Sequence, residues 1–205
     1  MQDSKLDQLL GLISQWPGLV SRPDRALIDD GLVLLDHLAD ARSLVDVGSG
    51  AGIPGLAIKI KRPDLDVTLI EADQSKAAFL VHAGAALQLQ RLTVVARRAE
   101  EAGHDPTLRE AFDVAVARAL APLPVLVELC LPVVRVGGRL LAQKTEKEDS
   151  ASAARAIELL GGELSRVRAS PSAARGGGTV VEINKVRLTP ERYPRRSGVP
   201  ARKPL

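Results

Sequence analysis

The sequence predicts an α/β domain with a doubly wound, mostly parallel seven-stranded sheet and a short helical lead-in at the N-terminus. Three observations predict it. From residue 43 onward, short apolar runs alternate with longer segments at helical spacing, which is typical of strand–helix–strand units with right-handed crossovers. Apolar residues make up 45% of the 205 residues and aromatic residues only 2%, so Leu, Val, Ala and Ile must form the core, as in a parallel sheet covered by helices. A glycine cluster follows the first strand, where such sheets bind ligands.

The expected elements follow one another in a regular order. In the lead-in, apolar residues recur at helical spacing over 4–15 and 24–39, with Pro17 and Pro23 between the two helices. Strands are expected at 44–47, 66–71, 92–96, 112–117, 139–143, 163–168 and 180–186. Helices are expected at 53–61, 74–89, 122–135 and 150–160, the last two closing at glycine pairs. The chain is therefore divided into a lead-in (1–42), a domain (43–186) and a basic tail (187–205).

Composition excludes several kinds of protein. The single cysteine, Cys130, permits neither an internal disulfide nor a cysteine-based metal cluster. The three histidines, His37, His82 and His104, are scattered without a ligand-spaced partner, so no metal is expected. The first residues lack the pattern of a signal peptide, and no apolar run reaches the length of a membrane span. We therefore expect a cytoplasmic protein without a membrane partner.

Positive charge is concentrated at the C-terminus. The last 21 residues hold seven Lys or Arg against one acidic residue, Glu191, although the net charge of the whole chain is only +3. Such a tail is a candidate for contact with a polyanion, and the alternative is a solvated, proline-rich extension. We expect RNA contacts from four of its residues, namely Arg195, Arg196, Arg202 and Lys203.

The strongest motif is the glycine-rich stretch at residues 45–55. Its Gly50-x-Gly52-x-x-Gly55 spacing formally matches a dinucleotide fingerprint. Two residues argue against a dinucleotide: Asp46 stands where a hydride-transfer enzyme usually has an apolar residue, and Pro54 removes an amide that a pyrophosphate would use. A cofactor with no phosphate and a charged amino-acid end fits both, which describes S-adenosylmethionine. An enzyme using a nicotinamide cofactor remains an alternative.

Two further positions fit an adenosine cofactor. Glu71 ends the second strand, 21 residues after Gly50, where an acid can accept hydrogen bonds from both ribose hydroxyls. The loop after the third strand could read the adenine ring through a backbone amide at Ala99 or Glu100. The alternative for Glu71 is a solvated acid at a strand end. The alternative for the loop after the third strand is the charged start of a helix.

Three stretches of this chain resemble one known family. They are residues 46–55, residues 63–71 and residues 112–119, and the Tyr-Pro-Arg-Arg segment of the tail at 193–196 adds to the likeness. Together they resemble the bacterial guanine-N7 methyltransferases of small-subunit ribosomal RNA, also called the glucose-inhibited division protein B family. The resemblance implies a class I, Rossmann-like methyltransferase domain that uses S-adenosylmethionine. It also implies methylation of a guanosine N7 in 16S rRNA, with the rRNA or the 30S subunit as partner. We expect a monomer, because nothing in the sequence demands more than one chain.

The resemblance and the motifs together predict the site. The cofactor-binding residues are expected to be Asp46, Gly48, Ser49, Gly50, Ala51, Gly52, Pro54, Glu71, Ala72, Ala99, Glu100 and Arg118. Arg118 is expected to orient cofactor and target, and Lys144 to contact RNA phosphate or guanine O6; both are assigned to catalysis. The alternative for Lys144 is a solvated, charged run. Guanine N7 has a free lone pair, so the absence of an obvious general base agrees with catalysis by orientation.

The chain departs from the family pattern near its N-terminus. Family members usually carry an Arg-His pair ahead of Asp-Ser, whereas residues 26–31 read Ala-Leu-Ile-Asp-Asp-Gly. The departure concerns the RNA-binding face more than the cofactor site. Two alternatives follow: a divergent methyltransferase acting on another RNA or a small molecule, and a non-catalytic RNA-binding protein with a vestigial cofactor fold.

Overall fold

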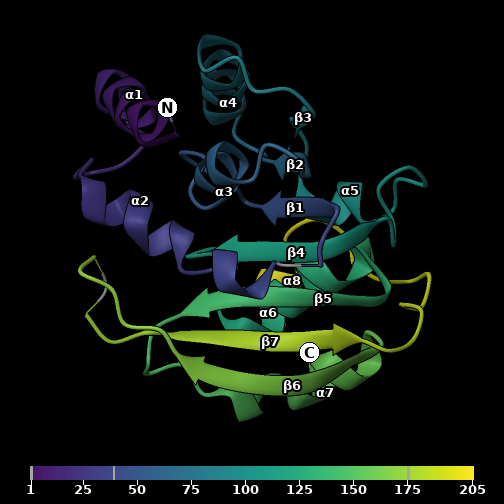
Figure 1. Cartoon of the computed structure of the whole chain (residues 1–205). Helices are drawn as coiled ribbons and strands as arrows, with labels where there is room; N and C mark the ends of the chain where they lie inside the picture. Colours follow the sequence, from purple (N-terminus) through teal and green to yellow (C-terminus); the bar gives the residue numbers. More distant parts are fainter. Residues whose placement is uncertain (1, 39, 175) are drawn as a thin grey trace.

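A computed structural model describes residues 2–38, 40–174 and 176–205. Its centre is a seven-stranded sheet in the order β3-β2-β1-β4-β5-β7-β6 (Figure 1). The strands are β1 (Ser43–Val47), β2 (Asp66–Ile70), β3 (Leu92–Val95), β4 (Phe112–Arg118), β5 (Val134–Lys144), β6 (Gly162–Ala169) and β7 (Thr179–Lys185). Strand β7 runs antiparallel to both its neighbours, and the other pairings are parallel. The predicted fold class is confirmed.

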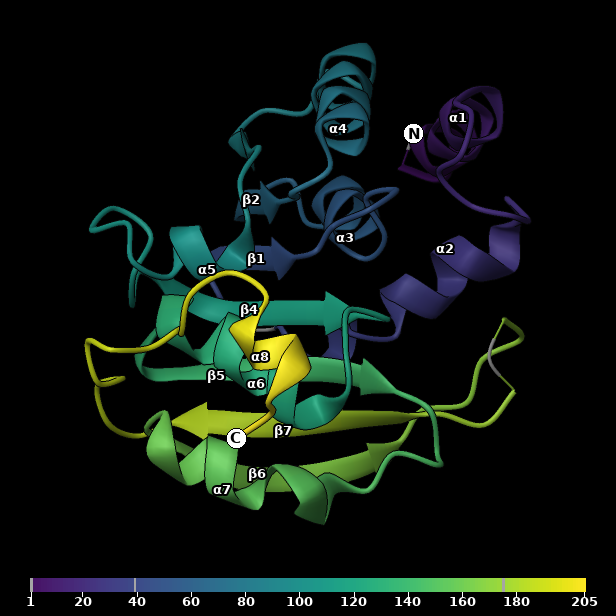
Figure 2. The same cartoon turned by 180° about the vertical axis from the view of Figure 1, so that it is seen from behind.

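Helices cover both faces of the sheet (Figures 1 and 2). The α-helices are α1 (Gln2–Gln15), α2 (Arg25–Leu32), α3 (Gly55–Lys61), α4 (Gln74–Ala86), α5 (Ala99–Ala102), α6 (Leu123–Cys130), α7 (Ala154–Leu159) and α8 (Val199–Arg202). Three short 3-10 helices are η1 (Leu35–His37), η2 (Leu131–Val133) and η3 (Ser150–Ala153). One core cluster joins the sheet to α1–α4, and a second joins it to α5–α7. Apolar side chains therefore pack against both faces of the sheet, as the apolar runs predict.

Strand β1 shows how the sequence divides between these cores. Leu44 belongs to the cluster under α1–α4, whereas Val45 and Val47 belong to the cluster under α5–α7. Successive side chains of a strand point to opposite faces. Asp46 therefore points to the side of Leu44, where α3 begins.

The predicted helix at 122–135 is wrong in its second half. Helix α6 ends at Cys130, and β5 already starts at Val134. The glycines expected to close the helix lie inside β5, where the register against β4 shifts. A Cβ on Gly138 would stand 2.5 Å from the carbonyl oxygen of Asp113, so glycine serves a close approach of two strands and not a helix end.

Smaller differences concern helix ends. The helix predicted from residue 53 begins at Gly55, and the helix predicted to residue 89 ends at Ala86. The segment predicted as one helix at 24–39 forms α2 and η1, and residue 39 lies outside the described residues. The lead-in packs onto the domain, since Leu6, Leu9 and Ile13 lie in the core shared with α3 and α4.

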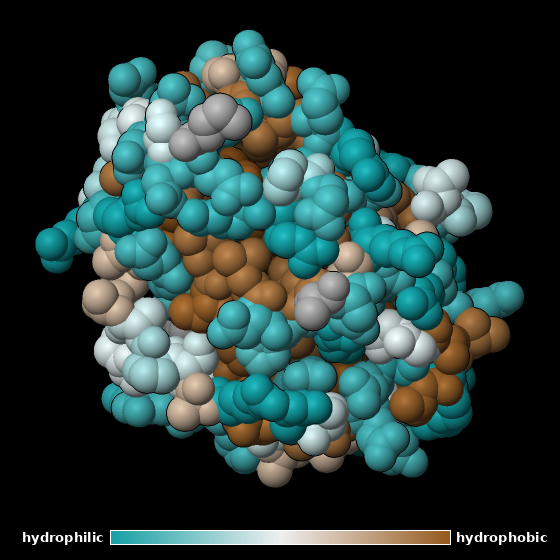
Figure 3. Space-filling view, viewed as in Figure 1, coloured by the Kyte–Doolittle hydropathy of each residue, from teal (hydrophilic) through white to brown (hydrophobic). Residues whose placement is uncertain are grey.

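The outer surface is mostly polar. Figure 3 shows hydrophilic side chains over most of the face seen in Figure 1, around a central area of apolar ones. The large apolar side chains that remain exposed are scattered over α4, β5, β6 and the tail: Val81, Val136, Leu164, Val167, Val186 and Leu188. Among the described residues, no helix combines the length and the apolar character that a membrane crossing needs.

Candidate active site

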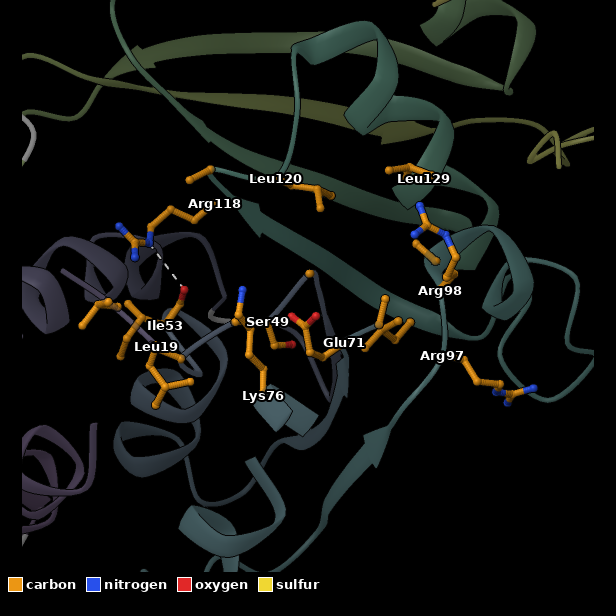
Figure 4. Close-up of a pocket in the computed structure, with 18 of the residues that line it drawn as sticks. Leu19, Ser49, Ile53, Glu71, Lys76, Arg97, Arg98, Arg118, Leu120 and Leu129 are labelled. Atoms are coloured by element: carbon orange, nitrogen blue, oxygen red, sulfur yellow. Dashed lines mark hydrogen bonds between the residues drawn. The ribbon is translucent and has the colours of Figure 1, made fainter. Parts of the chain in front are cut away.

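A cavity of about 410 Å³ opens beside the carboxyl ends of β1, β2 and β4 (Figure 4). This is the edge at which open α/β sheets bind ligands, and the volume is in the usual range for small-molecule sites. In Figure 4, Arg118, Ile53 and Leu19 lie at one end and Arg97 and Arg98 at the other, with Ser49 and Glu71 between them. The wall is formed by Leu19, Val20, Gly48, Ser49, Gly50, Ala51, Ile53, Ile70, Glu71, Ala72, Lys76, Arg97, Arg98, Ala99, Glu100, Arg118, Ala119, Leu120 and Leu129.

The glycine loop lies along the floor of this cavity. Gly48, Gly50 and Gly52 have φ values of 74°, 55° and 80°, a region that other residues seldom adopt. A Cβ on Gly48 would stand 2.5 Å from Leu120 Cδ1, so this position also needs a close approach. The amides of Gly48 and Ser49 both donate to the carbonyl of Ile70, which holds the loop against the end of β2.

Glu71 is placed as the sequence predicted, at the end of β2 and in the cavity wall. One carboxylate oxygen accepts from the Gly50 amide and the other from the Asp73 amide, each at 2.8 Å. These two bonds fix the orientation of a nearly buried carboxylate. Each of its oxygens can accept a further bond, which suits a ligand with two adjacent hydroxyls.

Asp46 does not line the cavity, and its predicted cofactor contact stays a prediction. Its side chain is 1% exposed, and one oxygen accepts from the Gly55 amide at 2.9 Å. The other oxygen has no hydrogen-bond partner among the described residues. Burial raises the pKa of Asp46 to about 7. Asp46 therefore anchors the start of α3 beneath the loop.

Gly52 and Pro54 also lie outside the cavity wall, and their expected cofactor contacts stay predictions as well. A Cβ on Gly52 would meet the side chain of Leu56 at 2.4 Å, and Pro54 packs against the backbone of α2 at Gly31. These two residues shape the loop from behind. The remaining predicted cofactor residues all lie in the wall: Gly48, Ser49, Gly50, Ala51, Glu71, Ala72, Ala99, Glu100 and Arg118.

Sequence reasoning missed about half of the wall. Arg97 and Arg98 stand directly before Ala99, so their place in the chain was a usable signal. Leu19 and Val20 come from the link between the lead-in helices, and Leu129 comes from α6. No local pattern marks those three residues, because only the packing of distant segments brings them to the cavity.

Arg118 reaches the cavity from the end of β4. Its side chain is 19% exposed. Its Nη1 lies 3.3 Å from Asp30 Oδ2, and its Nε donates to the carbonyl of Ile53 at 3.4 Å (Figure 4). The next residue, Ala119, has a φ of 52°, so the chain turns sharply directly after Arg118. The guanidinium is thus held at the rim of the cavity from two sides.

Lys144 does not line the cavity, and its predicted contact with RNA stays a prediction. Its side chain is 8% exposed, donates to the carbonyl of Ala121 at 2.7 Å and pairs with Glu148 at 3.0 Å. Glu148 in turn accepts from the Leu123 amide at the start of α6. The alternative of a solvated Lys144 is wrong. Lys144 stabilises the loop that follows Arg118.

The C-terminal tail is folded onto the domain. Arg195 donates to both oxygens of Glu128, which is fully buried in α6, and forms an ion pair with it. The RNA contact expected of Arg195 stays a prediction. The Gly198 amide donates to Glu100 Oε1 at 2.9 Å, which ties the tail to the cavity wall. The other three predicted RNA contacts, Arg196, Arg202 and Lys203, are exposed.

Solved structures with the same fold include several enzymes. A 16S rRNA N2 G1207 methyltransferase from T. thermophilus, in complex with AdoMet and guanosine, superposes with a TM-score of 0.58 at 19% identity, covering 85% of this chain and 42% of that one. A branched-chain polyamine synthase from Thermus thermophilus, in complex with N4-aminopropylspermidine and 5'-methylthioadenosine, superposes with a TM-score of 0.66 at 13% identity, covering 90% of this chain and 64% of that one. At these identities the likeness concerns the fold alone.

Sequence relatives are much more similar. The ribosomal RNA small subunit methyltransferase G of Moorella thermoacetica is 45% identical over 177 residues, which cover 85% of this chain and 74% of that protein. The protein of the same name from Roseiflexus sp. is 48% identical over 165 residues, covering 80% and 70%. That from Symbiobacterium thermophilum is 40% identical over 216 aligned residues, covering 96% and 87%.

The pattern of one family spans most of the domain. The match covers residues 20–175, which include the glycine loop, Glu71 and Arg118. The resemblance noted in the sequence is therefore confirmed. The chain belongs to the GidB family, rRNA small subunit methyltransferase G.

Proposed function

We propose that this enzyme transfers a methyl group from S-adenosylmethionine to N7 of a guanosine in 16S rRNA. The observation that carries the proposal is the cavity itself, in which the glycine loop, Glu71 and Arg118 share one wall at the carboxyl edge of the sheet. Membership of an rRNA methyltransferase family supports the reaction class and an rRNA substrate.

The residues present fit S-adenosylmethionine. Glu71 is a nearly buried carboxylate with acceptor capacity for two ribose hydroxyls, and the loop after β3 supplies the opposite wall. Arg118 offers a cation at the other end of the cavity, where a carboxylate of the amino-acid end can accept from it. When bound, S-adenosylmethionine supplies an electrophilic methyl group.

The composition of the wall supports an acceptor that needs no proton removal. Among the described residues that form it, there is no histidine, cysteine or tyrosine. Of its two acids, Glu71 accepts from loop amides and Glu100 from the Gly198 amide. Guanine N7 already carries a free lone pair, so the task left to the protein is orientation. Arg118 is suited to hold the target because a guanidinium can donate to guanine O6 and leave the N7 lone pair free.

Exposed cations near the cavity are the proposed RNA surface. Arg97 and Arg98 have 45% and 52% of their side chains exposed and lie in the wall of the cavity. Arg196, Arg202 and Lys203 are exposed on the tail, which is joined to that wall through Glu100. We propose that these side chains contact RNA phosphates and that the 30S subunit is bound by a monomer.

The direct test is methyl transfer from labelled S-adenosylmethionine to 30S subunits and to free 16S rRNA from a strain that lacks this gene. Mass spectrometry of nuclease digests would identify the product. A single N7-methylguanosine is the expected result. Methylation of another RNA alone would contradict the 16S assignment, and cofactor binding without any transfer would favour the alternative of a vestigial cofactor fold.

A further inference from the structure

Four segments that are distant in sequence meet behind Arg118. Asp30 comes from α2, Ile53 from the glycine loop, Gln143 from the end of β5 and Ser172 from the loop between β6 and β7. The carboxylate of Asp30 contacts Arg118 Nη1 at 3.3 Å and Ser172 Oγ at 2.6 Å. The backbone carbonyl of Asp30 accepts from Gln143 Nε2 at 2.6 Å. Asp30 is therefore the hub of a polar network beside the cavity.

Asp30 is an unusual residue to find there. Its side chain is fully buried, and acidic residues are almost never fully buried unless they are paired. Each carboxylate oxygen has a partner among the described residues, since Oδ2 faces Arg118 and Oδ1 accepts from Ser172. Burying a charge costs free energy, so this arrangement needs the partners to offset that cost.

The backbone around Asp30 brings α2 close to the cavity. A Cβ on the next residue, Gly31, would stand 2.6 Å from Ile53 Cγ2, so glycine allows α2 to lie directly on the loop. The carbonyl of Ile53 accepts from Arg118 Nε (Figure 4). The guanidinium thus has one partner on α2 and one on the glycine loop, and these two elements are themselves in contact.

We propose that Asp30 is a positioning residue that fixes the Arg118 guanidinium at the rim of the cavity. An arginine side chain loses rotamer freedom when a ligand orders it, so a fixed carboxylate lowers the cost of ordering the guanidinium on a ligand. Ser172 orients Asp30 in turn, so the loop between β6 and β7 supports the Arg118 guanidinium together with α2 and the glycine loop. The inference rests on the proposed function only for the identity of the ligand.

A double-mutant cycle separates positioning from a general structural role. Binding of S-adenosylhomocysteine is measured by calorimetry for the wild type, Asp30→Asn, Arg118→Met and the double variant. We expect Asp30→Asn to weaken binding about tenfold in the wild type and less than about twofold when Arg118 is already replaced. Equal losses in both backgrounds, or no loss in the wild type, would overturn the proposal.

Two further variants keep the test decisive. Asp29→Asn makes the same chemical change one residue away, on an exposed side chain paired with Arg25, and should leave affinity unchanged. Ser172→Ala removes one donor to Asp30 and keeps its charge, so it replaces Asp30→Asn in the cycle if that variant does not fold. We expect a loss of about threefold that also disappears in the Arg118→Met background.

The readout also separates this inference from the proposed function. Binding of S-adenosylhomocysteine requires no RNA. A cycle with the expected coupling, together with no methylation of 16S rRNA, would contradict the proposed substrate and leave the role of Asp30 intact. Methylation of 16S rRNA with no coupling would support the proposed substrate and contradict the role of Asp30.

Discussion

The end of the cavity formed by Arg118 is built in a different way from the rest. In the rest of the cavity, here called the local end, the glycine loop and Glu71 lie within 24 residues of one another, and their own backbone amides hold them together. At the other end, Arg118 is held by Asp30, which lies 88 residues away in the sequence, and Asp30 is held by Ser172, which lies 142 residues from it. The first end is a local motif, whereas the second exists only when α2 and the β6–β7 loop are packed on the sheet.

The comparison teaches which errors sequence reasoning makes. At the local end, six of the residues predicted from the loop and Glu71 lie in the wall: Gly48, Ser49, Gly50, Ala51, Glu71 and Ala72. Near the assembled end, Lys144 was expected to contact RNA, and its side chain is buried and supports the loop after Arg118. Asp30 was not expected at the site at all. Side-chain direction at a strand end depends on neighbours that the strand itself does not specify.

The largest expected effect concerns the acid beneath the local end. The pKa of Asp46 is raised from 3.8 to about 7 by burial, so the folded protein holds this proton where the unfolded chain has lost it. The contribution is fully present below pH 4 and is lost as the pH rises to about 7, by linkage on the order of 4 kcal/mol.

Urea unfolding of the wild type and Asp46→Asn at several pH values from 4 to 8 measures this slope. The variant should lack the fall in stability between pH 4 and 7 that Asp46 causes. Parallel curves for the two proteins would mean that the buried carboxyl does not titrate in this range.

Glu71→Ala tests the local end directly. The substitution removes the acceptor proposed for the ribose hydroxyls and releases the amides of Gly50 and Asp73, so we expect affinity for S-adenosylhomocysteine to fall about a hundredfold. The matched control is Asp66→Ala at the opposite end of β2, where the acid forms an exposed ion pair with Arg91. Similar losses in the two variants would argue against a specific role for Glu71.

Gly48→Ala tests whether the loop needs its backbone conformation. Its positive φ and the contact with Leu120 should cost about 1–2 kcal/mol of stability and weaken cofactor binding. Gly11→Ala is the control, because that glycine lies in α1 with open space around it and should gain about 0.5–1 kcal/mol. Denaturant unfolding measures both. A neutral result at Gly48 would show that the loop tolerates a side chain.

The smallest expected effect lies on the tail beside the local end. Replacing both Arg196 and Arg202 by alanine should weaken binding to 30S subunits and reduce the dependence of log K on log salt by about 1 per lost phosphate contact. Arg195 provides the contrast, because Arg195→Ala removes the guanidinium paired with buried Glu128, keeps the hydrogen bond from the amide of residue 195, and should lower stability by about 3–5 kcal/mol. An unchanged salt slope in the double variant would remove the tail from the RNA surface.

The sequence by itself determined the fold class, the order of the elements and the local end of the cavity. Strand periodicity, the glycine loop and the spacing to Glu71 are short-range properties, and the backbone needs no distant partner to express them. The helix predicted at 122–135 shows the limit of such reasoning, since a glycine pair at 137–138 is as compatible with a helix end as with the close approach of two strands that the structure shows.

Only the tertiary structure decided what the charged residues do. The sequence predicted ligand contacts for Lys144, Arg195 and Asp46, and the structure pairs Lys144 and Arg195 with acids of the protein and buries Asp46. It also placed Asp30 behind Arg118 and joined the tail to the cavity wall through Glu100. A charge finds its partner across the fold, and Coulomb attraction depends on distance in space and not on separation along the chain.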